Sequence, residues 1–425
     1  YEELHLVYAI DRQVQDMTSG EDIFGNLLES WAEHMDADVA AFIKPGDFMK
    51  MEPFFALHAF VCRECFLVQL PNMEAREHIF NEDYAYFSSY SQSVLDHARG
   101  YVEMMTERFG FGPEHQVVEV ASNDGYLLRY FKANGVKVLG IEPSGNVAAA
   151  AEQAGIPSRV RFFGVETARD LKAEGFSADL ICGANVMAHV PDINDFVGGF
   201  PILLGPTGIL TIEFPHLLRT LDELYYDQIY HEHYSYLSFH TVEKIFAAHG
   251  MTIFDVDEIK PQGGSLRVYA CHTGDATHPV QPAVAAMRER EYAEGLNGIE
   301  RYRRFADDVQ ATKHALLRFL MEAREAGKTV VGYGAPAKAT TLLCFCGVKT
   351  DLMDYTVDIS PLKHGHLLPG TRIPIHPPEK ILETRPDYVL IMAWNIKDEI
   401  MRNMAAVRDW GGKFVVPLPA VAVLD

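Results

Sequence analysis

The densest group of titratable side chains lies past the middle of the 425-residue chain, in the stretch Tyr230-His231-Glu232-His233. Histidine titrates near neutral pH, so it can remove or donate a proton during catalysis. Because His231, Glu232 and His233 are adjacent, no regular helix or strand directs all three at one ligand. We therefore assign at least one of them a structural role and choose His231. The stretch also lacks the spaced histidines of a zinc-binding helix, which argues against a metal site here.

A second group of polar residues follows an apolar strand candidate, Val117–Val120. Asn123 and Gly125 suit a tight turn that needs unusual backbone angles, and Asp124 can accept hydrogen bonds. Such a turn between a strand and a helix is a frequent ligand-binding loop in α/β sheets. The cofactor-binding residues predicted here are Glu119, Ala121, Ser122, Asn123, Asp124 and Gly125.

Two further strand candidates also end in polar residues. The strand ending at Ile141 leads into Glu142, whose carboxylate is placed to accept both hydroxyls of a ribose. A third strand runs into the stretch Ile181–His189, which again carries polar groups at its carboxyl end. Taken alone, Glu142 has the alternative of a capping or solvated carboxylate. Ligands of open α/β sheets bind at these strand ends, so the predicted cofactor site also includes Glu142, Pro143, Ser144 and Asn185.

A sheet must bring these strand ends together, and the apolar pattern predicts one. Two runs near the end of the pattern, Thr252–Val256 and Ser265–Cys271, have no full helix between them, which predicts an antiparallel hairpin closing the sheet. Four earlier runs are short and mostly apolar, as in buried parallel strands: Val117–Val120, Lys137–Ile141, Ala178–Cys182 and Gly208–Ile212.

The remaining sequence predicts two more parts. An amphipathic helix, Ile23–Met35, and the pair Cys62-Arg-Glu-Cys65 lie in the first ~100 residues. A charged helical stretch, about Val284–Ala326, precedes a second set of strand candidates: Thr329–Tyr333, Asp354–Val357, Tyr388–Met392 and Lys413–Val416. We expect an α/β protein with a small N-terminal domain (1–100), a cofactor-binding domain (101–283), and a helical connector leading into a Rossmann-like domain (284–425).

The composition limits the partners. A formal net charge of −22 argues against nucleic acid, because phosphate backbones are bound by clustered Lys and Arg. This net charge is still compatible with a small phosphorylated substrate bound in a local pocket. No apolar run approaches the ~20 residues of a membrane span, and the start of the chain lacks the pattern of a signal peptide. Six cysteines in a chain of this length suggest a reducing compartment. We expect a cytoplasmic monomer without nucleic-acid or membrane partners.

The loop, the acidic second strand and the polar third strand together resemble a class I S-adenosylmethionine (SAM) methyltransferase. The stretches Glu213–His216 and Tyr226–Ser238 closely resemble the deoxysugar C-methyltransferases of antibiotic pathways. The likeness extends over roughly Phe42–Leu424, through Val118–Ser144, Asn185–His189, Gly332–Lys338 and Trp410–Val416. It implies an N-terminal zinc-binding domain, a SAM-binding domain and a C-terminal Rossmann-like domain that helps to hold a nucleotide-sugar.

The resemblance implies methylation of the carbon next to the ketone of a nucleotide-linked 4-keto-deoxysugar. Forming that bond needs an enolate, and therefore a base and a donor to the enolate oxygen. By resemblance His233 is the base, and Glu232 binds the sugar or tunes His233. Tyr230 and His189 donate hydrogen bonds or relay protons, and Tyr84 reaches over the pocket from the N-terminal domain. The residues assigned to the substrate are Tyr90, Gly334, Ala335, Lys338 and Asp358.

The sequence departs from the family at three places. The family's zinc domain has two CxxC pairs, but only Cys62 and Cys65 are present, and Asp11–His34 holds no cysteine. We interpret the pair by default as reduced thiols and leave zinc open, because structural zinc needs four ligands. The histidines that could complete a site are His5, His34 and His58. Ala121 replaces the family's usual glycine. The loop Val357–His366 lacks the usual Arg and aromatic residues, which affects the expected nucleotide or sugar preference.

Three alternatives from other functional classes remain at this point. Gly332–Ala337 has the spacing G-x-G-x-x-A, and Asp358 follows the next strand candidate, as in an NAD-dependent oxidoreductase. A binding protein that has lost its activity is a second alternative. The third is an O- or N-methyltransferase, because the SAM-binding sheet alone does not choose the acceptor atom.

Overall fold

The computed structural model describes residues 2–4, 43–52, 55–72, 77, 80, 84 and 86–424. The predicted helix Ile23–Met35 lies outside these residues. The chain forms two compact units. The first unit comprises Tyr1–Leu4, Ala59–Leu224 and His231–Phe305, and the second comprises His5–His58, Tyr225–Tyr230 and Ala306–Asp425. The short segment Tyr225–Tyr230 thus belongs to the second unit although its neighbours along the chain belong to the first.

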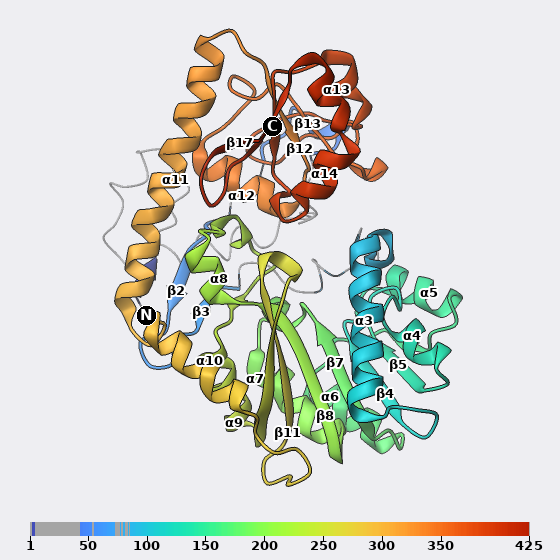
Figure 1. Cartoon of the computed structure of the whole chain (residues 1–425). Helices are drawn as coiled ribbons and strands as arrows, with labels where there is room; N and C mark the ends of the chain where they lie inside the picture. The colour runs from blue at the N-terminus through green and yellow to red at the C-terminus, as the bar shows by residue number, and fades with distance from the viewer. Residues whose placement is uncertain are drawn as a thin grey trace. The chain divides into compact units, whose positions relative to one another are not determined.

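The first unit is built on a seven-stranded sheet with the order β10-β11-β8-β7-β4-β5-β6 (Figure 1). The five strands from β8 to β6 are parallel, whereas β11 is antiparallel to both β8 and β10. The predicted closing hairpin is therefore confirmed. The strands are β4 (Gln116–Val120), β5 (Lys137–Ile141), β6 (Ser158–Arg159), β7 (Ala178–Ala184), β8 (Leu204–Pro215), β10 (Met251–Ile259) and β11 (Ser265–His272).

Helices cover both faces of this sheet, as a parallel sheet requires. Successive strand residues point to opposite faces, so Val117 and Leu180 lie in one core cluster and Val118 and Ile181 in the other. The first cluster is covered by α3 (Gln92–Phe109), α4 (Leu128–Ala133) and α5 (Gly145–Gln153). The second is covered by α6 (Val165–Ala173), α7 (Ile193–Leu203), α9 (Phe239–Ala248) and α10 (Pro282–Ala293).

A small antiparallel sheet, β1-β2-β3-β9, joins distant parts of the first unit. Its strands are β1 (Glu2–Leu4), β2 (Ala59–Val61), β3 (Val68–Gln69) and β9 (Ser235–Tyr236). The cysteine pair lies in the turn between β2 and β3, and β9 comes directly after the stretch with His231 and His233. Shorter elements of the unit are η3 (Ser88–Tyr90), η4 (Met187–His189), α8 (Leu217–Asp222) and η6 (Pro261–Gly263).

The second unit contains a six-stranded sheet with the order β14-β13-β12-β15-β16-β17, parallel except for β17. The strands are β12 (Val330–Tyr333), β13 (Thr356–Val357), β14 (Ile375–His376), β15 (Tyr388–Ile391), β16 (Lys413–Val416) and β17 (Ala422–Leu424). Its other elements are η2 (Pro45–Asp47), η5 (Tyr226–Gln228), α12 (Ala337–Cys346), η7 (Pro361–Lys363), α13 (Glu379–Thr384), η8 (Trp394–Ile396), α14 (Lys397–Asn403) and η9 (Ala405–Trp410).

The predicted helical connector is present as α10 and the long α11 (Ile299–Glu325). The boundary between the two units falls within α11, after Phe305. None of the helices in the described part of the chain combines the length and the apolar character needed to span a bilayer.

Candidate active site

The loop after β4 has the backbone geometry that its residue types predicted. Ala121, Asn123 and Gly125 all have positive φ, of 56°, 48° and 75°. A Cβ on Gly125 would lie 2.8 Å from Cγ1 of Ile156, so only glycine fits there. Ala121, which replaces the family's usual glycine, holds a left-handed conformation that costs an L-residue about 1–2 kcal/mol. The loop therefore keeps the turn at the cost of local strain.

Glu142 at the end of β5 is held in place by the same loop. Its two carboxylate oxygens accept the N–H of Asn123 and the N–H of Ser144, each at 2.9 Å. Burial raises the pKa of Glu142, and these two N–H groups oppose that shift. Each carboxylate oxygen has a second lone pair. The fixed carboxylate can therefore accept the two hydroxyls of a ribose.

Several buried polar atoms around this loop have no hydrogen-bond partner among the described residues. The two oxygens of Glu119 complete no hydrogen bond within the described residues, and the same holds for Oγ of Ser122, Oδ1 of Asp124 and Oδ1 of Asn185. Burial raises the pKa of Glu119 well above its usual value, and the charges of Glu142 and Asp124 add to this effect. Buried polar groups without partners are costly, so a ligand is expected to complete them. SAM brings a sulfonium, an ammonium and ribose hydroxyls, and these residues fit it.

The segment Ser88–Tyr90, which precedes α3, is hydrogen-bonded to side chains of the cofactor loop. The N–H of Ser88 donates to Oδ1 of Asn123 at 2.8 Å, and the N–H of Ser89 donates to Oδ2 of Asp124 at 3.2 Å. Asn123 and Asp124 thus have a second task besides shaping the turn. Tyr90, assigned to the substrate, ends this segment; its ring is 79% exposed and stacks on Phe87 with centroids 5.2 Å apart.

Tyr84 is fastened to the same site by a residue that the sequence analysis missed. Nδ2 of Asn146, in the first turn of α5, donates to the carbonyl of Tyr84 at 2.9 Å. Burial raises the pKa of the Tyr84 hydroxyl well above 10, and the charges of Glu232 and Glu142 raise it further. Tyr84 therefore stays protonated at neutral pH. The signal for Asn146 was its position as a polar residue opening an alanine-rich helix just after Glu142.

His189 and His233 lie against each other although 44 positions separate them in the chain. Their rings are 4.6 Å apart between centroids and cross at 77°. The N–H of Tyr234 donates to the carbonyl of Ala188 at 2.8 Å, which ties the two segments together. Burial lowers the pKa of His189 to about 4, with the carbonyl of Glu232 opposing the shift. His189 is therefore neutral at pH 7, and the largely buried His233 faces a neutral ring.

Four of the five predicted catalytic residues thus come together in the first unit: Tyr84, His189, Glu232 and His233. Burial raises the pKa of Glu232. Tyr230 belongs to the second unit, at the end of the segment that also contains η5.

Glu213, near the end of β8, is the centre of a buried hydrogen-bond network that was not predicted from the sequence. Oε2 of Glu213 accepts a hydrogen bond from Nε2 of His97 at 2.8 Å, and Oε1 accepts one from Nε of Arg267 at 2.7 Å. Burial alone would raise the pKa of Glu213, but the His97 hydrogen bond and the Arg267 charge outweigh it and lower that pKa. The carbonyl of Glu213 accepts the N–H of Asn185 at 2.8 Å. Glu213 therefore connects α3, β11 and the cofactor site.

In the second unit, Asp358 braces the loop after β12. Its Oδ2 accepts the N–H of Ala335 at 2.8 Å and lies 3.0 Å from Nζ of Lys363, while Oδ1 accepts the N–H of Ser360 at 2.9 Å. Gly334 has a φ of 97°, and a Cβ there would meet Cβ of Ala393 at 3.3 Å. The carboxylate of Asp358 is thus already occupied by protein groups.

Lys338 lies where the order of the strands reverses, between β12 and β15, a usual ligand position in such sheets. Nζ of Lys338 donates to Oδ1 of Asn395 and lies 4.3 Å from the ring centroid of Trp394. Burial lowers the pKa of Lys338 to about 8, with the charge of Asp227 opposing the shift. Asp227 also accepts a hydrogen bond from Nε1 of Trp394 at 2.6 Å. The cation is therefore partly compensated within the unit.

Three protein families match successive parts of the chain: "Putative zinc binding domain" at residues 38–80, "Methyltransferase domain" at 95–256 and "C-methyltransferase C-terminal domain" at 260–419. Over 374 residues the chain is 35% identical to C-methyltransferase NovU of Streptomyces niveus, covering 88% of this chain and 89% of that protein. The chain belongs to the SAM-dependent C-methyltransferase family. The predicted family and enzyme class are confirmed.

Solved structures resemble part of this C-methyltransferase. PH0226 protein from Pyrococcus horikoshii OT3 is 15% identical, with a TM-score of 0.36, over 44% of this chain and 94% of that one. Magnesium protoporphyrin IX methyltransferase from Synechocystis PCC 6803, solved with bound SAM, is 14% identical, with a TM-score of 0.32, over 46% and 88%. The strand order of the first unit and the methyltransferase-domain match confirm the predicted fold class.

The cysteine turn of this C-methyltransferase lies within the zinc-domain match, yet the described residues offer no set of metal ligands. No group of three or more His, Cys, Asp or Glu residues is arranged around a common point in residues 2–4, 43–52, 55–72, 77, 80, 84 and 86–424. Cys62 and Cys65 are both free thiols. His5 and His34 lie outside the described residues. Within these residues the pair does not fit structural zinc, which needs four ligands.

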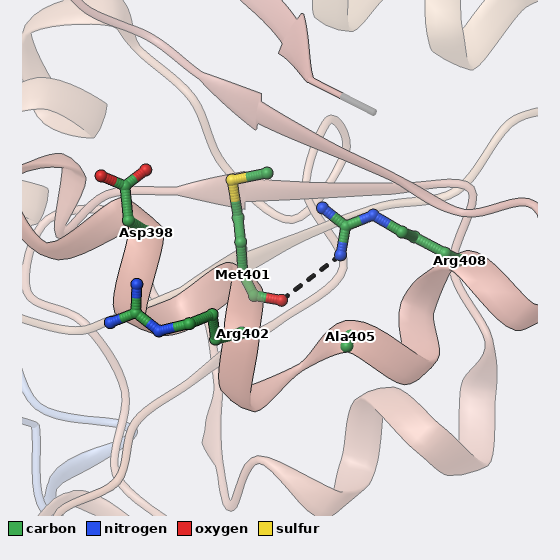
Figure 2. Close-up of a pocket in the computed structure, with 5 residues that line it drawn as sticks. All are labelled: Asp398, Met401, Arg402, Ala405 and Arg408. Atoms are coloured by element: carbon green, nitrogen blue, oxygen red, sulfur yellow. Dashed lines mark hydrogen bonds between the residues drawn. The ribbon is translucent and has the colours of Figure 1, made fainter.

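An open hollow of about 440 Å³ lies on the surface of the second unit (Figure 2). It is lined by residues of α14 and η9, and Nη1 of Arg408 donates to the carbonyl of Met401 at 3.4 Å across it. No predicted site residue lines it, and it has no part in the candidate active site.

Proposed function

We propose that this C-methyltransferase transfers the methyl group of SAM to the carbon next to the ketone of a nucleotide-linked 4-keto-deoxysugar. The observation that carries the proposal is the pair of His189 and His233, which lies with Glu232 and Tyr84 in the same unit as the SAM-binding loop. A C-methyltransferase must make a carbon nucleophile, and this cluster contains a base beside two neutral hydrogen-bond donors. The relative NovU is a C-methyltransferase, which supports transfer to a carbon atom.

The chemistry assigns a distinct task to each residue. His233 removes the proton from the carbon next to the ketone, and the electron pair of that C–H bond becomes the enolate. His189, with a pKa of about 4, and Tyr84, with its raised pKa, remain neutral at pH 7 and can donate to the enolate oxygen. When bound, SAM supplies an electrophilic methyl group, and the new C–C bond forms as the S–C bond breaks. Glu232 binds a sugar hydroxyl or orients His233.

The nucleotide end of the substrate is assigned to the loop after β12, with Gly334, Ala335 and Lys338. Lys338 supports this assignment, because a cation on the first turn of α12 attracts a phosphate. Asp358 contributes through the loop that it braces. Its Oδ2 accepts the N–H of Ala335 and also lies 3.0 Å from Nζ of Lys363, so this oxygen has no lone pair left for a ribose hydroxyl, unlike either oxygen of Glu142. That geometry removes the main support for the oxidoreductase alternative.

The test is a reaction of the purified chain with SAM and a panel of nucleotide-linked 4-ketosugars, followed by NMR of the product. A new C-methyl signal next to the ketone supports the proposal, whereas an O-methyl or N-methyl signal overturns it. A second measurement follows exchange of the substrate's alpha proton in deuterated water without SAM. Proton exchange without SAM shows that the base acts even when no methyl group can be transferred.

A further inference from the structure

A carboxylate outside the cofactor loop is buried in the first unit, at Glu291 on α10. Glu291 is 0% exposed. Its Oε1 accepts Nε2–H of His216 and the N–H of Phe239, both at 2.7 Å, and its Oε2 accepts the N–H of His240 at 2.8 Å. One side chain thus joins α10, the end of β8 and the first turn of α9. Neither the cofactor assignments nor the proposed mechanism uses it.

These bonds hold the end of one particular stretch, His231–Ser238, which we call the catalytic segment. The segment runs directly into α9, whose first two residues are the ones bound by Glu291. His216 also pairs with Leu237 as an isolated bridge, and the N–H of Leu217 donates to the carbonyl of Leu237 at 3.0 Å. Glu291 and His216 therefore fix the carboxyl-terminal end of the catalytic segment.

The other contacts of the catalytic segment fix its middle. Ser235 and Tyr236 form β9 and pair with β3. Tyr234 donates to the carbonyl of Ala188, next to His189. With both the middle and the end held, His233 is left in one position against His189. Glu291 and His216 supply the last of these anchors, at Leu237 and Phe239, so their loss is expected to loosen the segment that carries His233.

Helix capping accounts for only part of the contacts of Glu291: it accepts the N–H groups of Phe239 and His240 at the start of α9, but its bond to His216 lies outside the helix. Ser238 is already the N-cap of α9, because its Oγ accepts the N–H of Thr241 at 3.1 Å. A fully buried carboxylate is expensive to desolvate, and an apolar side chain of similar size is often at least as stabilising. A carboxylate that accepts three directed hydrogen bonds specifies geometry, which an apolar contact does not.

We infer that Glu291, together with His216, is a positioning residue that sets the catalytic segment so that His233 meets His189 and the substrate carbon. This inference rests on the proposed function, in which His233 is the base. Glu291 is not among the residues assigned to the substrate or to the cofactor. Its effect is expected on proton removal and not on SAM binding.

The test variant is Glu291→Gln, which keeps the size but turns an NH₂ group toward one of the two backbone N–H groups. We expect kcat and the rate of alpha-proton exchange to fall at least tenfold, with KM and the SAM dissociation constant changed less than twofold. The matched control is Glu243→Gln. It removes an ion pair with Arg288, at 2.6 Å, that joins the same two helices without touching the catalytic segment. This control should keep the wild-type kcat and exchange rate.

A second variant covers the case in which Glu291→Gln does not fold. His216→Asn leaves both backbone hydrogen bonds of Glu291 in place and should also lower kcat and exchange at unchanged SAM affinity. Wild-type exchange rates in the folded variants would overturn the inference alone, as would equal losses in the Glu243→Gln control. Absence of exchange in the wild-type protein would overturn the proposed function, and this inference with it.

Discussion

The two candidate ligand sites differ in whether the protein itself satisfies their polar groups. In the first unit Glu119, Ser122 and Asn185 bury oxygens that no described residue satisfies. In the second unit Asp358 and Lys338 are already bonded to protein groups. Unsatisfied buried groups are expensive and are kept where a ligand completes them, whereas satisfied ones stabilise a loop. The first site is therefore preformed for a cofactor, and the second presents a braced loop.

The largest expected effect is on proton removal and methyl transfer, which we place in the first unit. His233→Ala should lower alpha-proton exchange and methylation by about 10²–10⁴-fold, the usual contribution of a general base. SAM affinity by calorimetry should stay the same, because His233 is assigned to proton removal and not to cofactor binding. Exchange at the wild-type rate would reassign the base, with Tyr230 and His189 next to be tested.

The same comparison predicts that the preformed site loses cofactor affinity when one acceptor is removed. Glu142→Ala should weaken SAM binding by about 1–3 kcal/mol, the range for losing a hydrogen bond to a charged group. Nucleotide-sugar affinity in the second unit should not change. Calorimetry with each ligand separately makes the check, and an unaltered SAM dissociation constant would place the cofactor elsewhere.

In the second unit, substitution of Asp358 should lower the stability of the protein and leave cofactor affinity unchanged. Asp358→Asn loses the ion pair with Lys363 and one acceptor, so we expect a loss of about 1 kcal/mol in the free energy of unfolding. SAM affinity should remain unchanged. The readouts are denaturant unfolding and SAM calorimetry, and a variant with wild-type stability would contradict the bracing role.

The raised pKa of Glu119 predicts a pH dependence of cofactor binding. Below this pKa the buried carboxyl is neutral; as the pH rises through it, ionisation costs the cofactor-free protein stability. A bound cation favours the ionised form, so SAM affinity should increase with rising pH through the same range, with release of up to one proton. Calorimetry in two buffers of different ionisation enthalpy measures that proton. Glu119→Gln should remove the dependence, and a dependence that persists would assign the proton to another group.

The smallest effect is expected at the cysteine turn. Two thiols with no third ligand among the described residues predict little bound zinc, and Cys62→Ser should change the unfolding free energy by less than about 0.5 kcal/mol. Metal analysis of the purified chain is the measurement. A stoichiometric zinc signal lost in Cys62→Ser would show that other side chains complete a site.

The strands that the sequence predicted share a physical property. β4, β5 and β7 are largely buried on both faces, so each appears as a mostly apolar run that leads into predicted site residues. The short strands β6, β14 and β17 have two or three residues each and were not predicted. A strand this short has no pattern of its own, and its pairing comes from the neighbouring strand.

The sequence by itself determined the cofactor loop, because a turn such as Ala121–Gly125 and an acid such as Glu142 depend on residues within about 25 positions. Only the tertiary structure decided which polar side chains support them. Asn123 meets Ser88 across 35 positions, and His216 meets Glu291 across 75. No local pattern encodes such pairs, because a buried hydrogen bond depends on where two distant backbones come to lie. The ring contact of His189 with His233 was decided in the same way, by the sheets that hold both segments.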